Sequence, residues 1–383
     1  MRRAFDKTSI LPKLLIVSDT AMWRTKDGII AFEPVVREIE NFEYLFSKIT
    51  WIGFQQRDRT KQNNARGVVS DKVNIILLPS TGGDTLGAKL KTIILFPYIF
   101  IVVFYNVLTH QYIHSRNPSM PGLVSVLFSV FSTRKKFWHK WAGNWISSSH
   151  PISYRIQKFF IKIPKKAIVS VNGDWNKQAP NIQNLENPCF NEIELWRNNA
   201  IGQQKMFTGR LNICFVGNLV KSKGIMVFLQ SLKQIDLSKV NEIQIIGDGI
   251  LRGEAEKLAA VISDKIIFRG GLNRNQLDEV YGAMHFLCLP SNSEGFPKVI
   301  AEAMSFGCIP VVTNISCLSQ YIIDGTNGFL LEKNHENIIS KNITNLLGME
   351  GACLKEISDH AIQTSKLFTY ENYNKKIRKI FNL

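Results

Sequence analysis

One stretch of sequence decides the fold: Pro290-Ser-Asn-Ser-Glu-Gly-Phe-Pro-Lys-Val-Ile-Ala-Glu-Ala-Met-Ser-Phe-Gly-Cys-Ile-Pro-Val-Val-Thr313. Its pattern predicts a loop, a helix over 298–306 and a buried strand over 309–313. Two carboxylates, Glu294 and Glu302, stand eight positions apart across the helix start. Helix-start N–H groups bind phosphate oxygens and carboxylates accept hydrogen bonds from sugar hydroxyls, so the stretch predicts a site for a sugar and its phosphates. A capping acid plus a surface glutamate explains the pair equally well when the pair is considered alone.

The chain around this stretch alternates between strand and helix patterns. Strands are predicted over 211–216, 242–246, 265–268, 286–289 and 309–313, with helices over 224–234, 253–261, 275–282 and 298–306. Such alternation predicts a parallel sheet with helices on both faces, and ligands of these sheets lie beyond the carboxyl ends of the strands.

Other strand-end loops of this half carry glycines and cations. Gly217 and Asn218 follow the first strand, Lys223 stands near the next helix start, and Gly247 follows the second strand. Glycine lets a backbone approach a ligand and lysine offers a movable charge, which suits a diphosphate. An ordinary strand-to-helix turn with solvated lysines is the alternative.

The first half predicts a second domain of the same class. Short apolar runs predict strands over 13–18, 49–53, 73–78 and 167–171, with a helix over 32–46 and a polar loop over 19–28. The polar stretch 176–210 predicts a linker. We therefore expect an α/β protein with domains at 1–207 and 208–383, which suits 383 residues of which 45% are apolar.

Hydropathy and cysteine content indicate in which cell compartment the protein is located. The longest apolar stretch, 93–105, contains Pro97 and is expected to be too short to cross a bilayer, and the first residues lack the apolar core of a signal peptide. Six scattered cysteines without a C-x-x-C pair predict buried thiols rather than disulfides or zinc ligands. Together these features predict a cytoplasmic protein.

Positive charge is concentrated in the first half. The net charge is +16, and residues 1–200 hold 27 Lys and Arg against 14 Asp and Glu. The acid-free segment 85–173 mixes twelve basic residues with many aromatic ones. This mixture predicts contact with an anionic membrane, and a basic solvated face over an ordinary core is the alternative.

Six motifs occur in a fixed order: Phe215-Val-Gly-Asn-Leu with Lys223-Gly224, Ile246-Gly-Asp-Gly, Phe268-Arg-Gly, Leu289-Pro-Ser with Glu294-Gly-Phe-Pro and Glu302-Ala-Met, Gly307-Cys-Ile-Pro-Val-Val, and Asp324-Gly-Thr-Asn-Gly-Phe329. Residues 211–332 thereby resemble the nucleotide-sugar half of the family 4 glycosyltransferases, the glycosyl transferases group 1. The first half is less similar, although Leu15-Ile-Val-Ser-Asp-Thr and Trp138-His-Lys-Trp-Ala-Gly-Asn-Trp145 look like a bacterial surface-polysaccharide subgroup.

The resemblance implies a GT-B fold, in which two Rossmann-like domains with parallel sheets face a central cleft. It implies that the donor binds the second domain and the acceptor mainly the first, and that a last helix, for which 370–380 is the candidate, crosses back. It also implies a metal-independent enzyme that retains anomeric configuration. The absence of a D-x-D run agrees with the lack of a metal site.

Residue roles follow from the same resemblance, which implies that Glu294, Lys223 and His114 are the catalytic residues. Glu294 would contact the donor sugar, Glu302 the ribose, and Lys223 the diphosphate together with the helix start. The implied donor-binding set is Gly217, Asn218, Lys223, Gly247, Gly295, Phe296, Pro297, Lys298, Val299 and Glu302. Many family members have arginine at the position of Asn218, and Lys221 or Arg252 are candidates to replace it.

The first half supplies one catalytic candidate and three acceptor-side candidates. His114, at a predicted strand end, matches roughly where the family keeps a histidine beside the donor sugar, with a structural histidine as the alternative. Arg116 is close by in sequence. Asp19 follows the first strand, and capping is the alternative role for it; Gly28 is what is left of the family's usual paired glycines.

Three functions were compared. The loops of the second half favour a glycosyltransferase that uses a UDP- or GDP-linked donor and a glycan or lipid-linked acceptor in surface polysaccharide biosynthesis, without a cofactor and at the inner face of the cell membrane. One alternative is a GT-B relative such as a sugar-nucleotide epimerase. The other is a basic nucleic-acid-binding protein, although no zinc, RRM or KH signature accompanies the charge, so no nucleic-acid partner is expected.

Overall fold

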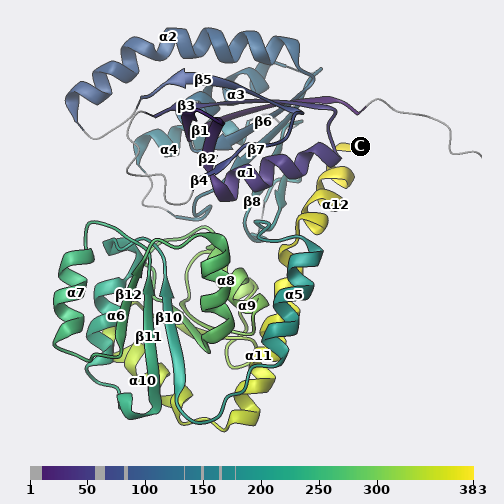
Figure 1. Ribbon diagram of the computed structural model, residues 1–383. Helices are drawn as coiled ribbons and strands as arrows, with labels where there is room; N and C mark the ends of the chain where they lie inside the picture. The colour runs from purple at the N-terminus through teal and green to yellow at the C-terminus, as the bar shows by residue number, and fades with distance from the viewer. Residues whose placement is uncertain are drawn as a thin grey trace, which may run out of the picture.

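The computed structural model describes residues 11–56, 65–81, 85–132, 134–147, 151–163, 166–176 and 178–383. The chain forms two lobes, each built around one sheet with helices on both faces (Figure 1). This arrangement agrees with the α/β class and the two Rossmann-like domains predicted from the alternating pattern.

The first lobe contains a sheet in the order β4-β2-β1-β6-β7-β8-β9, with β3 paired to β1 and β5 paired to β3. Its strands are β1 (Lys13–Thr25), β2 (Gly28–Phe32), β3 (Lys48–Gln55), β4 (Ala65–Gly67), β5 (Val73–Pro79), β6 (Tyr112–Asn117), β7 (Lys136–Trp141), β8 (Ile168–Val171) and β9 (Ile182–Asn184). The pairs are parallel except β1 with β2 and β2 with β4.

Helices cover the two faces of this sheet differently. They are α1 (Glu33–Glu40), followed by the 3-10 turn η1 (Asn41–Tyr44), α2 (Leu86–Thr109), α3 (Met120–Phe131) and α4 (Ile152–Ile161). Helices α2 and α3 pack on the core face that contains Leu15 and Val17, whereas α1 and η1 pack on the opposite face with Leu14 and Ile16. Both faces are therefore buried, as in other parallel sheets.

The polar loop predicted over 19–28 is wrong. Strand β1 continues through Thr25 and turns at Gly28 into β2, with Met22 paired to Ala31. Met22, Trp23 and Ala31 are buried. Local polarity suggested a loop, but antiparallel pairing with β2 and burial of Met22 and Trp23 extend the strand.

The expectation that the apolar segment around residues 93–105 is too short to cross a bilayer is also wrong. Helix α2 has 24 residues and is long and apolar enough, by length and composition, to cross a membrane. It begins where the Thr85 hydroxyl accepts from the Ala88 N–H at 3.2 Å, seven residues before the apolar stretch, and it continues past Pro97. Propensity and capping of the flanking residues added turns that the apolar run alone did not show.

The second lobe contains a fully parallel sheet in the order β12-β11-β10-β13-β14-β15. Its strands are β10 (Leu211–Val216), β11 (Val240–Ile246), β12 (Ile266–Gly270), β13 (Phe286–Leu289), β14 (Ile309–Thr313) and β15 (Phe329–Leu331). The strand order reverses between β10 and β13, and ligands of open α/β sheets bind at such a reversal.

The helices of this lobe follow the predicted alternation. They are η2 (Lys221–Lys223), α6 (Ile225–Leu232), η3 (Leu237–Lys239), α7 (Arg252–Ala260), α8 (Arg274–Ala283), α9 (Lys298–Ser305), η4 (Leu318–Gln320), α10 (Glu336–Leu347), α11 (Gly351–Ser365) and η5 (Lys366–Phe368). One large core made mostly of second-lobe side chains joins them.

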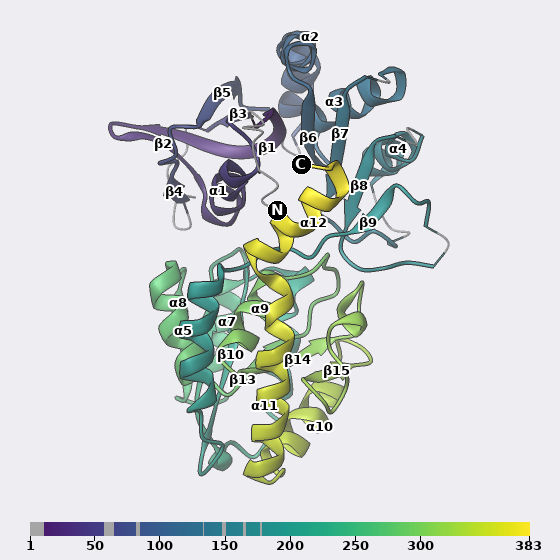
Figure 2. The ribbon, with the colours of Figure 1, turned by 90° about the vertical axis from the view of Figure 1, so that its right-hand side faces the viewer.

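Two helices belong to the lobe that their place in the chain does not suggest (Figure 2). Helix α5 (Glu192–Gln203) packs against α8, α9 and α11, although it precedes residue 207. The last helix, α12 (Tyr370–Phe381), returns to the first lobe, where Tyr373, Ile377 and Phe381 join the core with Phe42. Helix α5 thus precedes residue 207 but packs on the second lobe, and α12 follows residue 208 but packs on the first. The predicted domain boundary between residues 207 and 208 stays a prediction.

Candidate active site

The lobes meet where strand ends of both sheets face each other. Gly295, in the loop after β13, lies so close to the segment after β7 that an added Cβ would sit 2.6 Å from the Ala142 carbonyl oxygen. Nearby, the Asp174 N–H donates to Gln320 Oε1 at 2.7 Å, and Gln320 Nε2 donates back to the Asp174 carbonyl at 2.8 Å. The predicted site residue Gly295 therefore stands at the contact between the lobes, where a side chain does not fit.

Lys223 and Glu294 are 71 residues apart in sequence and lie together at the carboxyl ends of β10 and β13. Lys223 Nζ donates to Glu294 Oε1, and the Ser291 hydroxyl donates to the same oxygen at 2.9 Å. Both side chains are mostly buried, 24% and 11% exposed. Strands β10 and β13 are hydrogen-bonded neighbours, which places their terminal loops side by side. The structure thus joins a cation and a carboxylate, both predicted as catalytic residues.

The other predicted glycines shape the loops next to this pair. Gly247 has φ +124°, and a Cβ there would collide with the Gly217 carbonyl. The backbones of the two loops therefore stack directly on each other at these glycines. Asn218, next to Gly217, is exposed.

The two candidates to replace the missing arginine differ. Lys221 is exposed on η2. Arg252 is already paired, with Nε 2.8 Å from Glu256 Oε1 and Nη1 3.3 Å from Asp248 Oδ2. Lys221 is thus the more available cation of the two.

The start of α9 offers backbone rather than side chains. The Phe296 ring is buried and stacks on Phe368 with ring centroids 4.5 Å apart. Lys298 Nζ donates to the Pro188 carbonyl at 2.6 Å, and burial lowers the pKa of Lys298. Pro297 precedes the helix, and Lys298 and Val299 form its first turn, so the groups suited to an anion there are first-turn N–H groups.

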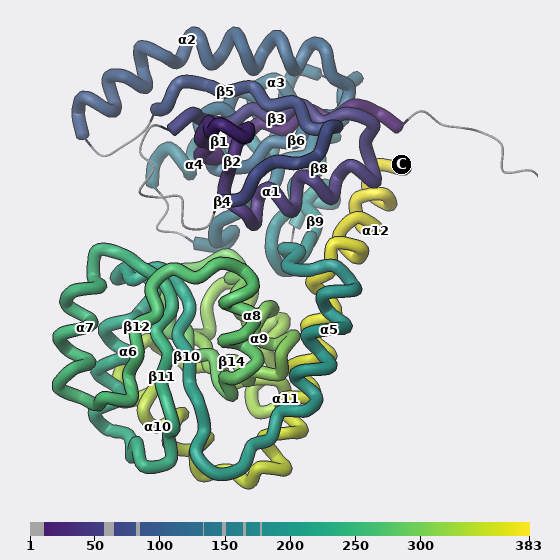
Figure 3. The backbone as a smooth tube through the Cα atoms, in the orientation of Figure 1, coloured from purple at the N-terminus to yellow at the C-terminus, as the bar shows by residue number. Residues whose placement is uncertain are grey.

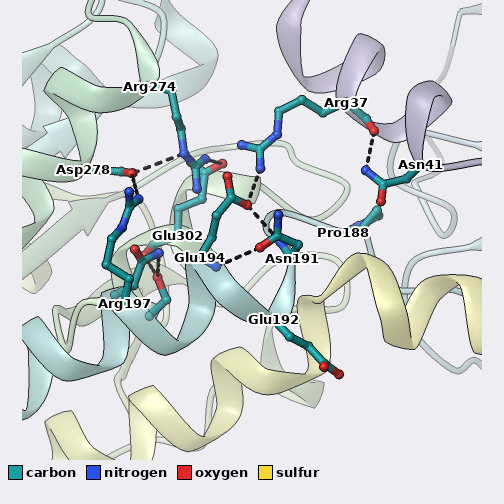
Figure 4. Close-up of polar contacts among 12 residues, drawn as sticks. Arg37, Asn41, Pro188, Asn191, Glu192, Glu194, Arg197, Arg274, Asp278 and Glu302 are labelled. Carbon is teal, nitrogen blue, oxygen red and sulfur yellow. Dashed lines mark hydrogen bonds and ion pairs between the residues drawn. The ribbon is translucent and has the colours of Figure 1, made fainter. Parts of the chain in front are cut away.

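Glu302 lies in a buried ionic group that the sequence did not reveal (Figure 4). Arg274 Nη1 donates to Glu302 Oε1 at 2.6 Å, and Arg274 Nε is 3.2 Å from Asp278 Oδ1. Burial alone would lower the pKa of Arg274, but Glu302 and Asp278 outweigh it and raise that pKa above its usual value. Arg274 follows the loop after β12, and its position after a strand-end loop is the signal that points to it.

Arg37 connects the first lobe to α5 in the same region (Figure 4). Its guanidinium donates to Glu194 Oε2, and the Asn191 N–H donates to that oxygen at 2.9 Å. The Glu194 N–H donates to Asn191 Oδ1 at 2.8 Å, which completes a capping box at the start of α5. One carboxylate therefore both caps α5 and pairs with the first lobe.

A cavity of about 750 Å³ in the first lobe contains two of the acceptor-side candidates. Its lining is Asp19, Thr20, Ala21, Trp23, Phe32, Val35, Gln56, Arg116, Asn117, Pro118, Ala142, Gly143 and Tyr154. The Asp19 side chain is accessible within this cavity. Desolvation by the cavity walls raises the pKa of Asp19, and a backbone hydrogen bond and the charge of Arg116 oppose that effect only in part. The cavity extends to Gly143, next to the Ala142 carbonyl that approaches Gly295.

The structure places Gly28 outside this cavity. Gly28 lies at the β1–β2 turn with φ +128°, and nothing lies within 4 Å of an added Cβ. The glycine there serves the turn, because other residues rarely adopt that backbone conformation.

His114 lies in the first-lobe core. It is fully buried, its ring lies 3.8 Å from that of Trp138 and edge-on to Phe42, and its Nδ1 is 3.2 Å from the Trp138 carbonyl. Burial lowers its pKa well below the usual value. In this arrangement the imidazole has no exposed surface with which to contact a sugar.

Arg116 belongs to a buried cluster that also fastens α12. Glu38 Oε1 accepts from Arg116 at 2.9 Å, from Lys140 at 2.7 Å and from the Tyr373 hydroxyl at 3.1 Å. Burial would raise the pKa of Glu38, but Arg116 and Lys140 outweigh it and hold that pKa well below its usual range. Burial lowers the pKa of Lys140 to about 7. Sequence reasoning missed Glu38 and Lys140, which come from separate elements.

No group of three or more His, Cys, Asp or Glu side chains among the described residues is placed to hold a metal ion. Five of the six cysteines are buried with free thiols, and Cys353 is exposed.

Comparison with known families shows what the second lobe is similar to. Residues 197–365 match the model of the family described as Glycosyl transferases group 1. The second lobe is therefore similar to the domain of that family, and the match covers less than half of the chain. The matched residues include Lys223, Glu294, Arg274 and Glu302, so the ionic pairs at its strand ends lie within the family's own region.

Similar sequences extend this result. An uncharacterized glycosyltransferase of Methanocaldococcus jannaschii is 32% identical over 170 residues, 44% of this chain and 46% of that protein. Another from the same organism is 25% identical over 334 residues, 85% of this chain and 77% of that protein. The capsular polysaccharide biosynthesis glycosyltransferase CapM of Staphylococcus aureus is 27% identical over 163 residues, 41% of each chain. The match thus spans less than half of the first and third relatives.

Solved structures share the whole fold. The Anabaena protein Alr3699/HepE, crystallised with UDP and glucose, superposes with a TM-score of 0.70 and 16% identity, covering 97% of this chain and 99% of that one. WaaG, a glycosyltransferase involved in lipopolysaccharide biosynthesis, superposes with a TM-score of 0.66 and 14% identity, covering 96% and 99%. The predicted GT-B fold is confirmed.

Proposed function

We propose that the protein is a retaining, metal-independent glycosyltransferase that uses a UDP- or GDP-linked sugar donor in surface polysaccharide biosynthesis. The observation that carries the proposal is the Lys223–Glu294 pair at the strand-order reversal, facing the first lobe. The domain family and the named relatives support glycosyl transfer. The neighbour crystallised with UDP and glucose supports a nucleotide-sugar donor.

The donor diphosphate binds Lys223 and the first-turn N–H groups of α9. As the glycosidic bond to the donor breaks, negative charge develops on the departing nucleoside diphosphate. A nearby ammonium and preorganised N–H groups stabilise that charge without a metal ion. Gly217 and Gly247 carry no side chain, so the backbone of these strand-end loops can approach the phosphates closely.

Glu294 changes partner when the donor binds. Before binding, its carboxylate accepts from Lys223 and Ser291. The phosphates then compete for Lys223, which frees lone pairs of Glu294 for the hydroxyls of the transferred sugar. Binding of the diphosphate and orientation of the sugar are thereby linked through one ion pair.

Glu302 accepts from the ribose diol, and Arg274 holds its carboxylate in place. A carboxylate has about four lone-pair sites, so the Arg274 hydrogen bond leaves capacity for two hydroxyl groups. The exposed fraction of Glu302, 7%, is small, which suits one edge of a bound ribose rather than a solvated acid.

The acceptor, a glycan or a lipid-linked glycan, occupies the first-lobe cavity. Asp19 and Arg116 line that cavity and offer an acceptor and a donor of hydrogen bonds to its hydroxyls. The close approach of Ala142 to Gly295 brings the cavity next to the loop that carries Glu294. We place the protein in the cytoplasm at the inner membrane face, because the acid-free segment 85–173 would be attracted to anionic lipid.

Calorimetry with UDP and GDP and a thermal-shift screen of their sugar conjugates test this proposal, since a ligand of the native state raises its melting temperature. We expect one nucleotide series to bind and Glu302→Ala to weaken it strongly. Unchanged affinity in Glu302→Ala would contradict the assignment. Incubation with and without acceptor then separates transfer from epimerisation, because only an epimerase converts its nucleotide sugar when no acceptor is present.

A further inference from the structure

Helix α2 exposes an apolar stripe that its own lobe does not cover. Ile99, Val103 and Val107 on its inner side are buried in the core. The outward side carries Leu90, Ile94, Tyr98, Ile101, Tyr105 and Leu108, which are 50–67% exposed and recur every three or four residues. A helix on the surface of a water-soluble domain normally presents polar residues there. A continuous apolar stripe of this length marks an interaction surface.

Helix α2 lies on the outer side of the first lobe, away from the second lobe (Figures 1 and 3). Helix α3 packs against both α2 and α4, so the three helices form one layer. Helix α4 adds the exposed side chains of Ile152 and Phe159, 74% and 66% exposed, and α3 adds Phe131, 84% exposed. The outward surface of this layer, the α2–α4 face, is therefore apolar at several places besides α2.

Positive charge borders the same face. Lys89 and Lys91 are exposed on the first turns of α2. At its other end, Lys135 Nζ donates to the carbonyls of Leu108 and of the C-cap residue His110, at 2.9 and 2.7 Å. Arg155 is exposed on α4. The segment that contains all three helices has no Asp or Glu. Two such faces from two copies would repel each other, whereas anionic headgroups would be attracted.

We infer that α2 docks the protein on an anionic bilayer by lying in the membrane plane, with its outward stripe among the acyl chains and the flanking cations at the headgroups. Tyr98 and Tyr105 have the amphipathic rings that suit this boundary. A crossing of the bilayer is disfavoured because it would remove Ile99, Val103 and Val107 from the core. The inference adds an apolar insertion to the electrostatic contact proposed above and does not depend on donor binding.

Vesicle sedimentation of the full chain tests the inference. With phosphatidylcholine vesicles that contain phosphatidylglycerol, we expect the protein to remain bound at about 1 M salt, where the Debye length is only about 3 Å. Ile94→Glu/Ile101→Glu changes two outward residues and should reduce binding by about 100-fold or more, since two apolar side chains lose their burial. The matched control is Ile250→Glu/Val261→Glu, at exposed apolar positions of the second lobe, which should bind as the unchanged protein does.

Four results would overturn the inference. Complete release of the unchanged protein at high salt would leave an electrostatic contact alone, and unchanged binding of the α2 variant would exclude α2 as the docking element. A lipid-free dimer abolished by the α2 variant would assign the stripe to a second copy. Insertion has its own readout: a tryptophan in Ile101→Trp should be quenched by lipids brominated on their acyl chains, and no quenching would contradict it. If the α2 variant binds nucleotide with unchanged affinity, the variant is folded and donor binding does not depend on membrane docking.

Discussion

Replacing Lys223 with methionine tests the central interaction of the proposed donor site. Methionine keeps the length of the side chain and removes its charge. Lys223 donates to Glu294, with the two side chains 24% and 11% exposed, so the interaction is partly shielded from water. The variant removes the cation for the diphosphate and at the same time leaves Glu294 as an uncompensated negative charge beside it.

The expected loss follows from these two effects. A hydrogen bond to a charged group contributes about 1.5–3 kcal/mol. Lys223 exchanges one anionic partner for another when the donor binds, which reduces the net gain, whereas the unpaired Glu294 in the variant adds repulsion. We expect these corrections to oppose each other and the dissociation constant for the nucleoside diphosphate to rise by roughly 10- to 100-fold.

Isothermal calorimetry with the diphosphate and the matching monophosphate measures this effect. The monophosphate lacks the β-phosphate and should lose less affinity than the diphosphate in Lys223→Met. Lys239→Met, at an exposed lysine on the turn η3 that precedes β11 and so lies at the opposite end of the sheet, is the matched control and should change both constants little. Lys223→Met/Glu294→Gln should recover part of the diphosphate affinity because the repelling carboxylate is gone. Equal diphosphate affinity in Lys223→Met and the unchanged protein would refute the reasoning.

Three further outcomes are expected. Arg274→Met should weaken nucleotide binding about as much as Glu302→Ala, as measured by calorimetry, because Glu302 loses the partner 2.6 Å away that orients it; a loss confined to stability would assign Arg274 a structural role only. Gly295→Ala should lower transfer activity while nucleotide affinity changes little, because the added Cβ forces the Ala142 backbone away, and normal activity would contradict the close approach of the lobes. Burial lowers the pKa of His139 from 6.5 to about 3, so the unfolded chain binds the proton first on acidification. The contribution of His139 to the free energy of unfolding is therefore complete above pH 6.5 and is lost toward pH 3 at about 1.4 kcal/mol per pH unit. Between these pH values, the free energy of unfolding measured in urea should fall less steeply with decreasing pH in His139→Gln than in the unchanged protein, by about that slope.

Local pattern predicted the second lobe well. The expected strand ranges 211–216, 286–289 and 309–313 match β10, β13 and β14, because strands buried on both faces form short apolar runs bounded by glycine and polar loops. The helix that carries Glu302 was also located within one residue at its end. These elements depend on neighbouring residues, which is what a local pattern records.

The first lobe shows where local pattern fails. The stretch 19–25 has the polarity of a loop but becomes strand because β2 pairs with it. His114 has the spacing of a strand-end residue but is enclosed by Trp138 and Phe42, which come from other elements. Both observations have one cause: the partner that determines the surroundings of the residue lies elsewhere in the chain.

By itself the sequence determined the alternating architecture, the motifs of the family and the candidate residues Lys223, Glu294 and Glu302. Only the tertiary structure decided their partners. Strand order places β10 beside β13 and so joins Lys223 to Glu294, and the packing of α8 on the same lobe supplies Arg274 to Glu302. It also decided that one side of α2 is covered and the other is not. Spacing along a chain sets which residues share an element, whereas contacts between elements depend on how sheets order their strands and bury their faces.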